Sequence, residues 1–218
     1  MKPLLRFLYE LHYLVVATWR RLGILFLKEP LFRSQLEETG ASMVFYDSPI
    51  LTGKIRIRLG ESVMFGGGRL RLIGTEGGSP GELIMGNHSG IGANSRVTVH
   101  ERVVLEDHAM VSFGCSISDA DSADERRAPA PKPVHIGRYA WIGNGVRIYQ
   151  GVTIGEGAII GAKSVVINDI PPYCVAIGNP AEVYFRNVGR PKKSPAQTST
   201  TSGTTQMEPT STPAAPQE

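Results

Sequence analysis

One stretch decides the fold, and from Ile136 to Val166 it reads IGRYAWIGNGVRIYQGVTIGEGAIIGAKSVV. A branched aliphatic residue returns at every sixth position of this stretch, at Ile136, Ile142, Ile148, Ile154, Ile160 and Val166. An α-helix turns every 3.6 residues and a β-strand alternates every two, so neither element alone produces this period. A short strand followed by a corner, and then repeated, does produce it. The stretch therefore predicts a solenoid whose successive turns stack on one another.

Small residues complete each hexapeptide. Glycine follows the aliphatic residue at 137, 143, 155 and 161, and a small or β-branched residue lies four places after it, at Ala140, Val146, Val152, Ala158 and Ser164. Glycine at a corner permits backbone geometry that a Cβ would oppose. We expect the aliphatic side chains to point inward and to pack between those of neighbouring coils, with strands about 4.7–4.9 Å apart.

The spacing of six continues upstream in two groups, which are Met85 with Ile91, and then Val99, Leu105, Val111 and Ile117. The step of eight from Ile91 to Val99 predicts a bulged corner. Residues 118–133 contain prolines and a cluster of charges that a solenoid strand would not tolerate, so they predict an excursion loop. The glycine-rich turns and alternating apolar residues of 41–83 are interpreted as irregular first turns of the solenoid.

Three motifs resemble those of the hexapeptide-repeat acyltransferases, in the order of that family: residues 136–143, residues 160–166 and the sequence Gly178-Asn179-Pro180-Ala181. The resemblance implies a mainly β fold, a left-handed parallel β-helix over 41–188, usually assembled as a homotrimer. It also implies an enzyme that moves an acetyl or other acyl group from coenzyme A to a hydroxyl or amine of a sugar or polysaccharide precursor. Acetyl-CoA is the expected co-substrate.

The resemblance places the acyl thioester in a groove between neighbouring subunits. Trp141 and Asn144 would lie beside the pantetheine arm, and main-chain groups at Ala162 and Ser164 would bond its amides. The alternative is that all four are ordinary solenoid corner residues.

The same resemblance places cations after the Gly-Asn-Pro-Ala exit that contains Pro180. Arg186, Lys192 and Lys193 follow this exit and would face the phosphates of coenzyme A through charge-assisted bonds. A solvated basic segment is the competing interpretation.

The general base is not evident from the motifs. Sugar O-acetyltransferases of the family carry a histidine in the excursion loop, but residues 118–133 contain none. His88 and His108 each stand fourth in their hexapeptides, so we expect them to stack on successive coils about 5 Å apart. Either could then serve as the base.

Two alternatives remain open. Asp119 or Asp121 could act as the base or could support an amine acceptor, as in an N-acyltransferase for an amino sugar nucleotide. Otherwise the chain has lost catalysis and keeps the solenoid as a binding or assembly module.

Composition excludes several other classes. A net charge of +3 without a basic run among aromatics argues against nucleic acid as a partner. No metal is expected, because the γ-class carbonic anhydrases that share this repeat need two histidines five residues apart, a pair absent from positions 12, 88, 100, 108 and 135. The two cysteines suggest no disulfide framework, so a cytoplasmic location is expected.

Both ends of the chain differ from the repeat region. Residues 1–40 are predicted to form an amphipathic helical segment, because leucines recur at helical spacing within 1–28. This helix either caps the solenoid, packs against another subunit, or makes a peripheral contact with the inner membrane face. Residues 189–218 are rich in Thr, Ser, Pro and Gln and are predicted to be a disordered tail.

Overall fold

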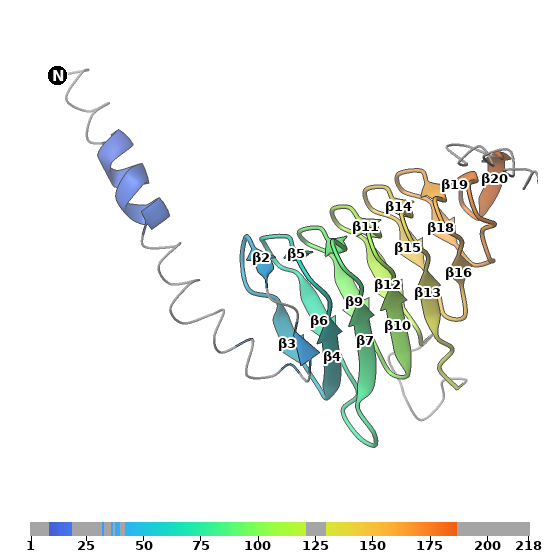
Figure 1. The fold of residues 1–218 in the computed structure, drawn as a ribbon, viewed down its shortest axis with the longest axis horizontal. Coiled ribbons are helices and arrows are strands. Elements are labelled where there is room, and N and C mark those ends of the chain that lie inside the picture. The colour runs from blue at the N-terminus through green and yellow to red at the C-terminus, as the bar shows by residue number, and fades with distance from the viewer. Residues whose placement is uncertain are drawn as a thin grey trace, which may run out of the picture.

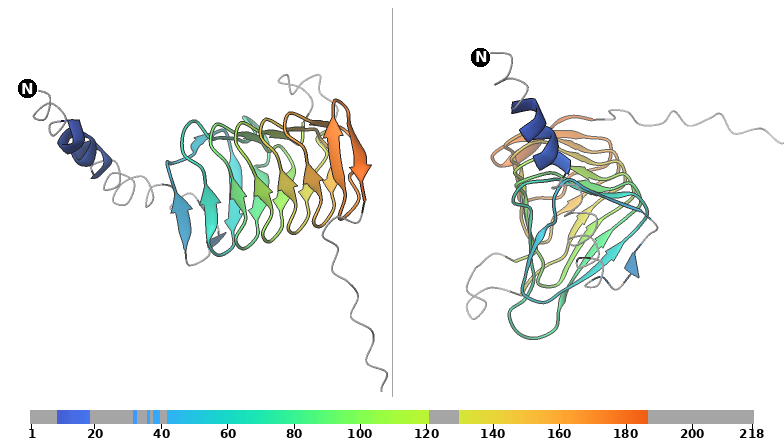
Figure 2. Two further views of the ribbon diagram at one scale, coloured as in Figure 1. Left: turned by 90° about the horizontal axis from the view of Figure 1, so that it is seen from above. Right: turned by 90° about the vertical axis from the view of Figure 1, so that its left-hand side faces the viewer.

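The computed structural model describes residues 9–18, 32, 36, 38–39, 42–120 and 130–186. Its strands form three sheets that make the walls of a left-handed parallel β-helix, and the chain visits the three walls in turn (Figures 1 and 2). The period of six in the sequence corresponds to one strand and one corner, so three hexapeptides complete a coil.

We name the walls sheets A, B and C. Sheet A contains β1 (Glu38–Thr39), β4 (Ile55–Leu59), β7 (Gly81–Met85), β10 (Arg102–Leu105), β13 (Val134–Ile136) and β16 (Thr153–Ile154). Sheet B contains β2 (Met43–Phe45), β5 (Val63–Phe65), β8 (Gly90–Ile91), β11 (Met110–Val111), β14 (Trp141–Ile142), β17 (Ile159–Ile160), β19 (Val175–Gly178) and β20 (Ala181–Phe185). Sheet C contains β3 (Ile50–Thr52), β6 (Arg71–Ile73), β9 (Arg96–Thr98), β12 (Ser116–Ser118), β15 (Arg147–Ile148) and β18 (Val165–Val166).

The aliphatic residues at every sixth position form the core. Ile136 pairs with Ile154 in sheet A, and Ile142 pairs with Ile160 in sheet B. These four side chains are at most 1% exposed, so each packs between its counterparts in the coils before and after it. The hypothesis that residues 41–83 form the first turns is also confirmed, because β2 to β7 pair in parallel with later strands.

One prediction about register was wrong. The residue in register after Ile91 is Val97, which pairs with Ile117 in sheet C, and not Val99. The two extra residues therefore lie between Val97 and Leu105, at the corner from sheet C to sheet A. Val99 is nevertheless fully buried, and a second buried valine at that corner made the period ambiguous in the sequence.

Long connections gather on the edge between sheets C and A. Residues 74–80 connect β6 to β7, and residues 119–133 connect β12 to β13. The predicted excursion loop thus lies between Ser118, the last residue of β12, and Val134, the first of β13, although 121–129 fall outside the described residues. Because the insertions share one edge, the walls of sheets B and C continue past them without interruption.

Each end of the core is covered. At the N-terminal end Phe32 is 4% exposed, and its ring lies edge-on against Phe65 with the centroids 5.5 Å apart. At the other end β20 turns back antiparallel on β19, which buries Ala181 and packs Val183 against the core. Apolar side chains that would otherwise face solvent at the two open ends are therefore shielded.

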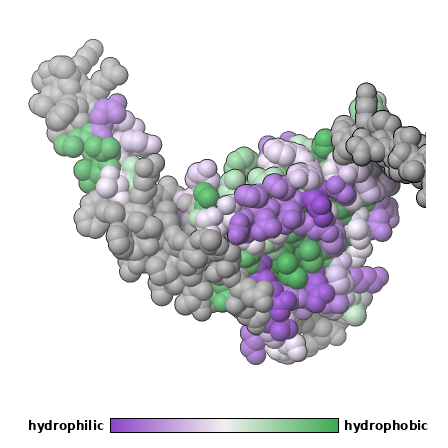
Figure 3. All heavy atoms as spheres, viewed as in Figure 1, coloured by the Kyte–Doolittle hydropathy of each residue, from purple (hydrophilic) through white to green (hydrophobic). Residues whose placement is uncertain are grey.

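The N-terminal helix spans residues 9–18. It exposes apolar side chains, including Leu14 at 63% and Val16 at 50%. Figure 3 shows both hydrophobic and hydrophilic surface on this helix. The predicted helical segment 1–40 extends too far, because Glu38–Thr39 form β1 of sheet A. No helix among the described residues is long and apolar enough to cross a membrane. The predicted tail 189–218 lies outside the described residues.

Candidate functional site

Corner residues on the edge between sheets B and C form a ladder of main-chain hydrogen bonds. The N–H of Gly145 donates to the carbonyl of Phe113 (2.8 Å), and the N–H of Lys163 donates to the carbonyl of Asn144 (2.7 Å). Phe113, Asn144 and Ala162 are thus equivalent positions on consecutive coils. The side chain of Asn144 also accepts a hydrogen bond from the hydroxyl of Ser112.

The ladder ends at Ala162. Among the described residues, nothing hydrogen-bonds to its main-chain N–H or carbonyl. The carbonyl lacks a partner because no coil follows on this edge, whereas the N–H at this corner position takes no part in the ladder. Its side chain is exposed. An unpaired donor and acceptor on one exposed residue can bind an amide of an extended ligand in the way that a sheet edge binds a strand.

At Ser164, two residues further along the chain, the hydroxyl and the main-chain carbonyl are already hydrogen-bonded. This residue is 1% exposed, and its hydroxyl accepts a hydrogen bond from the N–H of Gly178 at 3.1 Å. Its main-chain carbonyl accepts from the N–H of Arg147 at 2.9 Å. The geometry therefore favours Ala162 over Ser164 as the residue that offers free main-chain groups.

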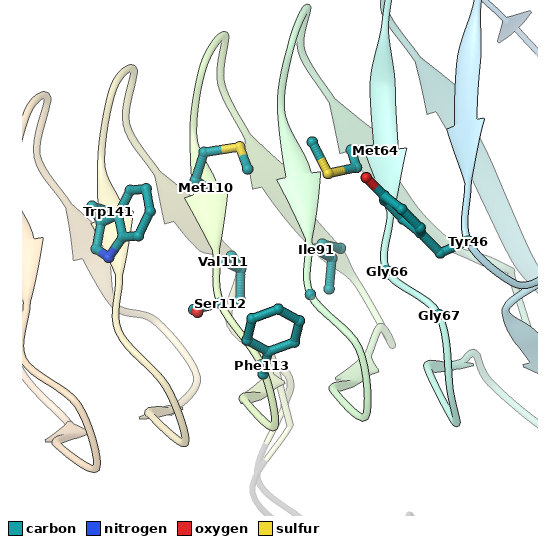
Figure 4. A pocket seen from close by; sticks show the side chains of 11 residues that line it. Tyr46, Met64, Gly66, Gly67, Ile91, Met110, Val111, Ser112, Phe113 and Trp141 are labelled. Atoms are coloured by element: carbon teal, nitrogen blue, oxygen red, sulfur yellow. The ribbon is translucent and has the colours of Figure 1, made fainter.

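An apolar groove of about 440 Å³ lies along the outer face of sheet B (Figure 4). Met64 and Met110 extend toward each other over Gly90, where an added Cβ would lie 3.2 Å from atoms of both side chains. Trp141, which is 53% exposed, lies on the outer face of the next strand after Met110. Glycine at position 90 therefore lets two flexible methionines cover the strand and form one wall of the groove.

Two predicted cofactor residues lie near the C-terminal end of the described chain. Pro180 is exposed in the turn between β19 and β20, and Arg186 is exposed immediately after β20. Neither lines the groove on sheet B. Lys192 and Lys193 fall outside the described residues.

A column of aromatic rings occupies the opposite edge of sheet B, where sheet A meets it. The rings of His88 and His108 are stacked with centroids 5.0 Å apart, which confirms the predicted stacking. The ring of Tyr139 stacks on the other face of His108 at 4.7 Å and 6°. All three residues have φ between 55° and 59°, so their side chains leave equivalent corners in the same direction.

Tyr139 was missed as a candidate, although a signal was present. It stands fourth in the hexapeptide that begins at Ile136, as His108 does in the hexapeptide that begins at Leu105. Tyr139 carries a phenol, whereas the bases predicted from the sequence are imidazoles and carboxylates.

Asp119 has a structural role, which corrects its candidacy as a base. Its side chain is fully buried, and its carboxylate accepts hydrogen bonds of 2.7–2.9 Å from the main-chain N–H groups of His100, Glu101 and Arg102. These bonds hold the corner that carries the two extra residues. With no exposed oxygen, Asp119 cannot reach an acceptor. Asp121 lies outside the described residues.

The predicted site residues are therefore split over sheet B. Asn144 and Ala162 lie on its edge with sheet C, His88 and His108 lie on its edge with sheet A, and Trp141 lies on the face between them. In one chain these groups do not converge on a single point. Among the described residues, no three His, Cys, Asp or Glu side chains are placed to hold a metal ion.

Comparison with known sequences identifies the repeat. The family model for the bacterial transferase hexapeptide (six repeats) matches residues 133–168. The chain is 35% identical over 116 residues to the polysialic acid O-acetyltransferase of Escherichia coli O1:K1 / APEC, which covers 49% of this chain and 37% of that protein. It is 57% identical over 51 residues to a Staphylococcus aureus (strain COL) protein named only provisionally as an acetyltransferase, covering 23% of this chain and 26% of that one. The chain spans about a quarter to just over a third of the length of these curated relatives.

Comparison with solved structures supports the fold. A mutant of AntD, an N-acyltransferase from Bacillus cereus in complex with dTDP and coenzyme A, superposes with a TM-score of 0.60. The match covers 74% of this chain and 89% of that one at 17% identity. At this identity the likeness concerns the architecture alone.

Proposed function

We propose that the chain, whose residues 133–168 match the family model for the bacterial transferase hexapeptide, is an acyltransferase that takes an acetyl or other acyl group from coenzyme A and passes it to a saccharide. The observation that carries the proposal is Ala162 at the end of the corner ladder, whose main-chain N–H and carbonyl have no hydrogen-bond partner in the part of the chain that the structure describes. The pantetheine arm of coenzyme A is an extended chain with two amides, and its amides match these groups. Asn144, one coil before, lies beside the same path.

The apolar groove on sheet B supports the same donor. A pantetheine arm and its acyl group present methylene and methyl surface, which an apolar wall of Met64, Met110 and Trp141 would take out of water. The edge that carries Ser112 and Phe113 borders this groove, so one extended ligand can use the edge for its amides and the groove for its apolar part.

The acceptor half of the reaction needs a base. The acceptor hydroxyl oxygen attacks the thioester carbonyl carbon, the C–S bond breaks, and coenzyme A leaves as a thiolate. A histidine that takes the hydroxyl proton and passes it to this thiolate balances the step and accelerates it by about 10² to 10⁴. His88 and His108 are the candidates, and their separation from Ala162 across sheet B favours a site shared between two subunits of a homotrimer.

A second candidate function follows from the excursion loop. Residues 118–133 contain no histidine, so the chain could bind and assemble through its β-helix without transferring an acyl group. The two functions differ in whether coenzyme A binds and turns over.

The test uses Ala162→Phe, since Phe113 occupies the equivalent corner position and shows that a ring fits there. We expect calorimetry to detect coenzyme A binding by the wild type and a loss of at least tenfold in affinity in Ala162→Phe. A thiol-release assay with acetyl-CoA and a panel of saccharides then compares His88→Ala and His108→Ala with His135→Ala. His135 pairs with Glu106 on sheet A at 2.9 Å and serves as the matched control.

One histidine variant on the aromatic column should lose about 10² or more in turnover while His135→Ala keeps it. If the wild type neither binds coenzyme A nor releases thiol with any acceptor, the assembly function replaces the enzymatic one. Light scattering on the same samples tests the trimer.

A further inference from the structure

A row of arginines follows the outer face of sheet C. Arg71 pairs with Arg96 on the next strand, Arg96 pairs with Ser116, and Ser116 pairs with Arg147. Neighbouring strands lie about 4.8 Å apart, so Arg96 and Arg147 flank Ser116 at about 9–10 Å from each other. All three arginines are exposed.

None of these arginines has an acidic partner among the described residues. Sheet A shows the contrast, because there Glu82 forms ion pairs with Arg58 on one neighbouring strand and with Arg102 on the other, at 3.0 and 2.8 Å. Like charges directly opposite on neighbouring strands destabilise a sheet. Arg71 and Arg96 are directly opposite each other, so this pair carries a cost that a carboxylate would relieve, as Glu82 does on sheet A.

The row borders a polar pocket of about 520 Å³. Arg96 and Arg147 line it together with the hydroxyl-bearing residues Ser116, Ser118 and Tyr149. The hydroxyl of Ser116 makes no hydrogen bond to another described residue, so it is free to bind a ligand. Two guanidinium groups on either side of a free hydroxyl suit a carboxylate or phosphate, which arginine binds in bidentate fashion.

We propose that this pocket binds an anionic group of the saccharide acceptor, a carboxylate or a phosphate, between Arg96 and Arg147 over Ser116, with Arg71 contacting a further anionic group along the same row. The inference rests on the proposed acyltransferase function, because that function makes the bound saccharide the acyl acceptor. It adds the chemical class of this acceptor, which is an anionic saccharide. The pocket extends along sheet C from the corner with sheet B, at Gly114 and Gly145, to Ala120, where the excursion between sheets C and A begins. Coenzyme A also carries phosphates, so the experiment must separate the two sources.

Binding is measured directly by calorimetry, which needs no turnover, with trigalacturonate and glucose 1,6-bisphosphate as anionic probes and galactotriose as the neutral one. The variants are Arg96→Ala, Arg147→Ala and Arg147→Lys. Arg56→Ala is the control. Arg56 is exposed on sheet A, so its replacement removes the same charge from a different wall of the β-helix. All three positions are exposed, and circular dichroism verifies that the four variants fold.

We expect the wild type to bind at least one anionic probe. Its affinity for galactotriose should be at least tenfold lower than its affinity for that probe. Each alanine variant on sheet C should lose about tenfold in affinity for that probe, which is about 1.4 kcal/mol. Arg147→Lys should recover part of the loss, because it keeps the charge without the planar fork. Arg56→Ala should stay within twofold of wild type, and affinity should fall as salt is raised.

Three results would overturn the proposal. The first is that neither anionic probe binds, and the second is that the neutral probe binds as tightly as the anionic ones. The third is that Arg56→Ala loses as much affinity for the anionic probe as the sheet C variants. Coenzyme A affinity is measured on the same variants and should stay within twofold of wild type. A parallel loss of coenzyme A affinity would assign the row to cofactor phosphates instead. If coenzyme A never binds while the anionic probe does so through the arginines, the enzymatic function fails and the anion site survives.

Discussion

Replacing Asp119 by alanine should destabilise the β-helix rather than slow a chemical step. The buried carboxylate accepts hydrogen bonds from three main-chain N–H groups, of His100, Glu101 and Arg102. A donor left without a partner costs about 1–3 kcal/mol where it is buried, and less where water reaches it, as it can at the exposed residues Glu101 and Arg102. Three such donors amount to about 3–9 kcal/mol, and water entering the vacated space reduces the loss, so we expect about 4 kcal/mol.

A total stability of about 5–15 kcal/mol makes this loss measurable by urea denaturation followed by circular dichroism. Asp119→Asn should lose less, about 2 kcal/mol, because its amide oxygen can still accept from some of the three donors. Asp169→Ala is the matched control. Asp169 is exposed and, among the described residues, accepts a hydrogen bond only from the N–H of Thr153, at 2.7 Å. Water can replace this acceptor, so the loss should stay below about 1 kcal/mol.

The structural assignment of Asp119 fails under one combination of results. If Asp119→Ala unfolds at the same urea concentration as Asp169→Ala and yet abolishes thiol release from acetyl-CoA, the carboxylate takes part in catalysis. A stability loss with turnover retained in the folded fraction supports its role as an anchor of the corner.

Three further outcomes are expected. Phe32→Ala should lower the free energy of unfolding by about 3 kcal/mol in thermal denaturation, because it uncovers the end of the core. Tyr46 is 60% exposed, so Tyr46→Ala should change the free energy of unfolding by less than about 1 kcal/mol, and equal losses would contradict the capping role of Phe32. Cys115 and Cys174 are buried, so they should react with a thiol reagent only after denaturation, and fast labelling of the native protein would refute this. Burial also raises the pKa of the Cys115 thiol, so the unfolded chain releases that proton at lower pH than the folded one. The free energy of unfolding should therefore fall as pH rises above about 8.5. The full chain should float with anionic liposomes and a Leu14→Glu variant should not, because the N-terminal helix exposes its apolar side chains; a full chain that stays with the soluble fraction rules the contact out.

Local pattern was sufficient to predict much of this molecule. A residue at every sixth position can point inward on every coil only if a strand and a corner alternate, so the sequence alone indicated a solenoid and which side chains form its core. The same counting placed His88 and His108 on successive coils, because they occupy the same position within their hexapeptides. Counting also places Asn144 and Ala162 at the same corner on consecutive coils, because each residue's place in the period determines its place around the coil.

Register between coils was decided only by the tertiary structure, since coil lengths change wherever the edge between sheets C and A carries an insertion. The pairing of Val97 with Ile117, and of Ser116 with Arg147 across the excursion, depends on where those extra residues lie, which a one-dimensional period does not specify. For this reason the arginine row was invisible in the sequence, where its members are far apart and separated by segments of unequal length. The role of Asp119 was also decided by the tertiary structure. The sequence does not distinguish an exposed carboxylate in an acidic loop from a buried one that binds the main-chain N–H groups of the neighbouring coil.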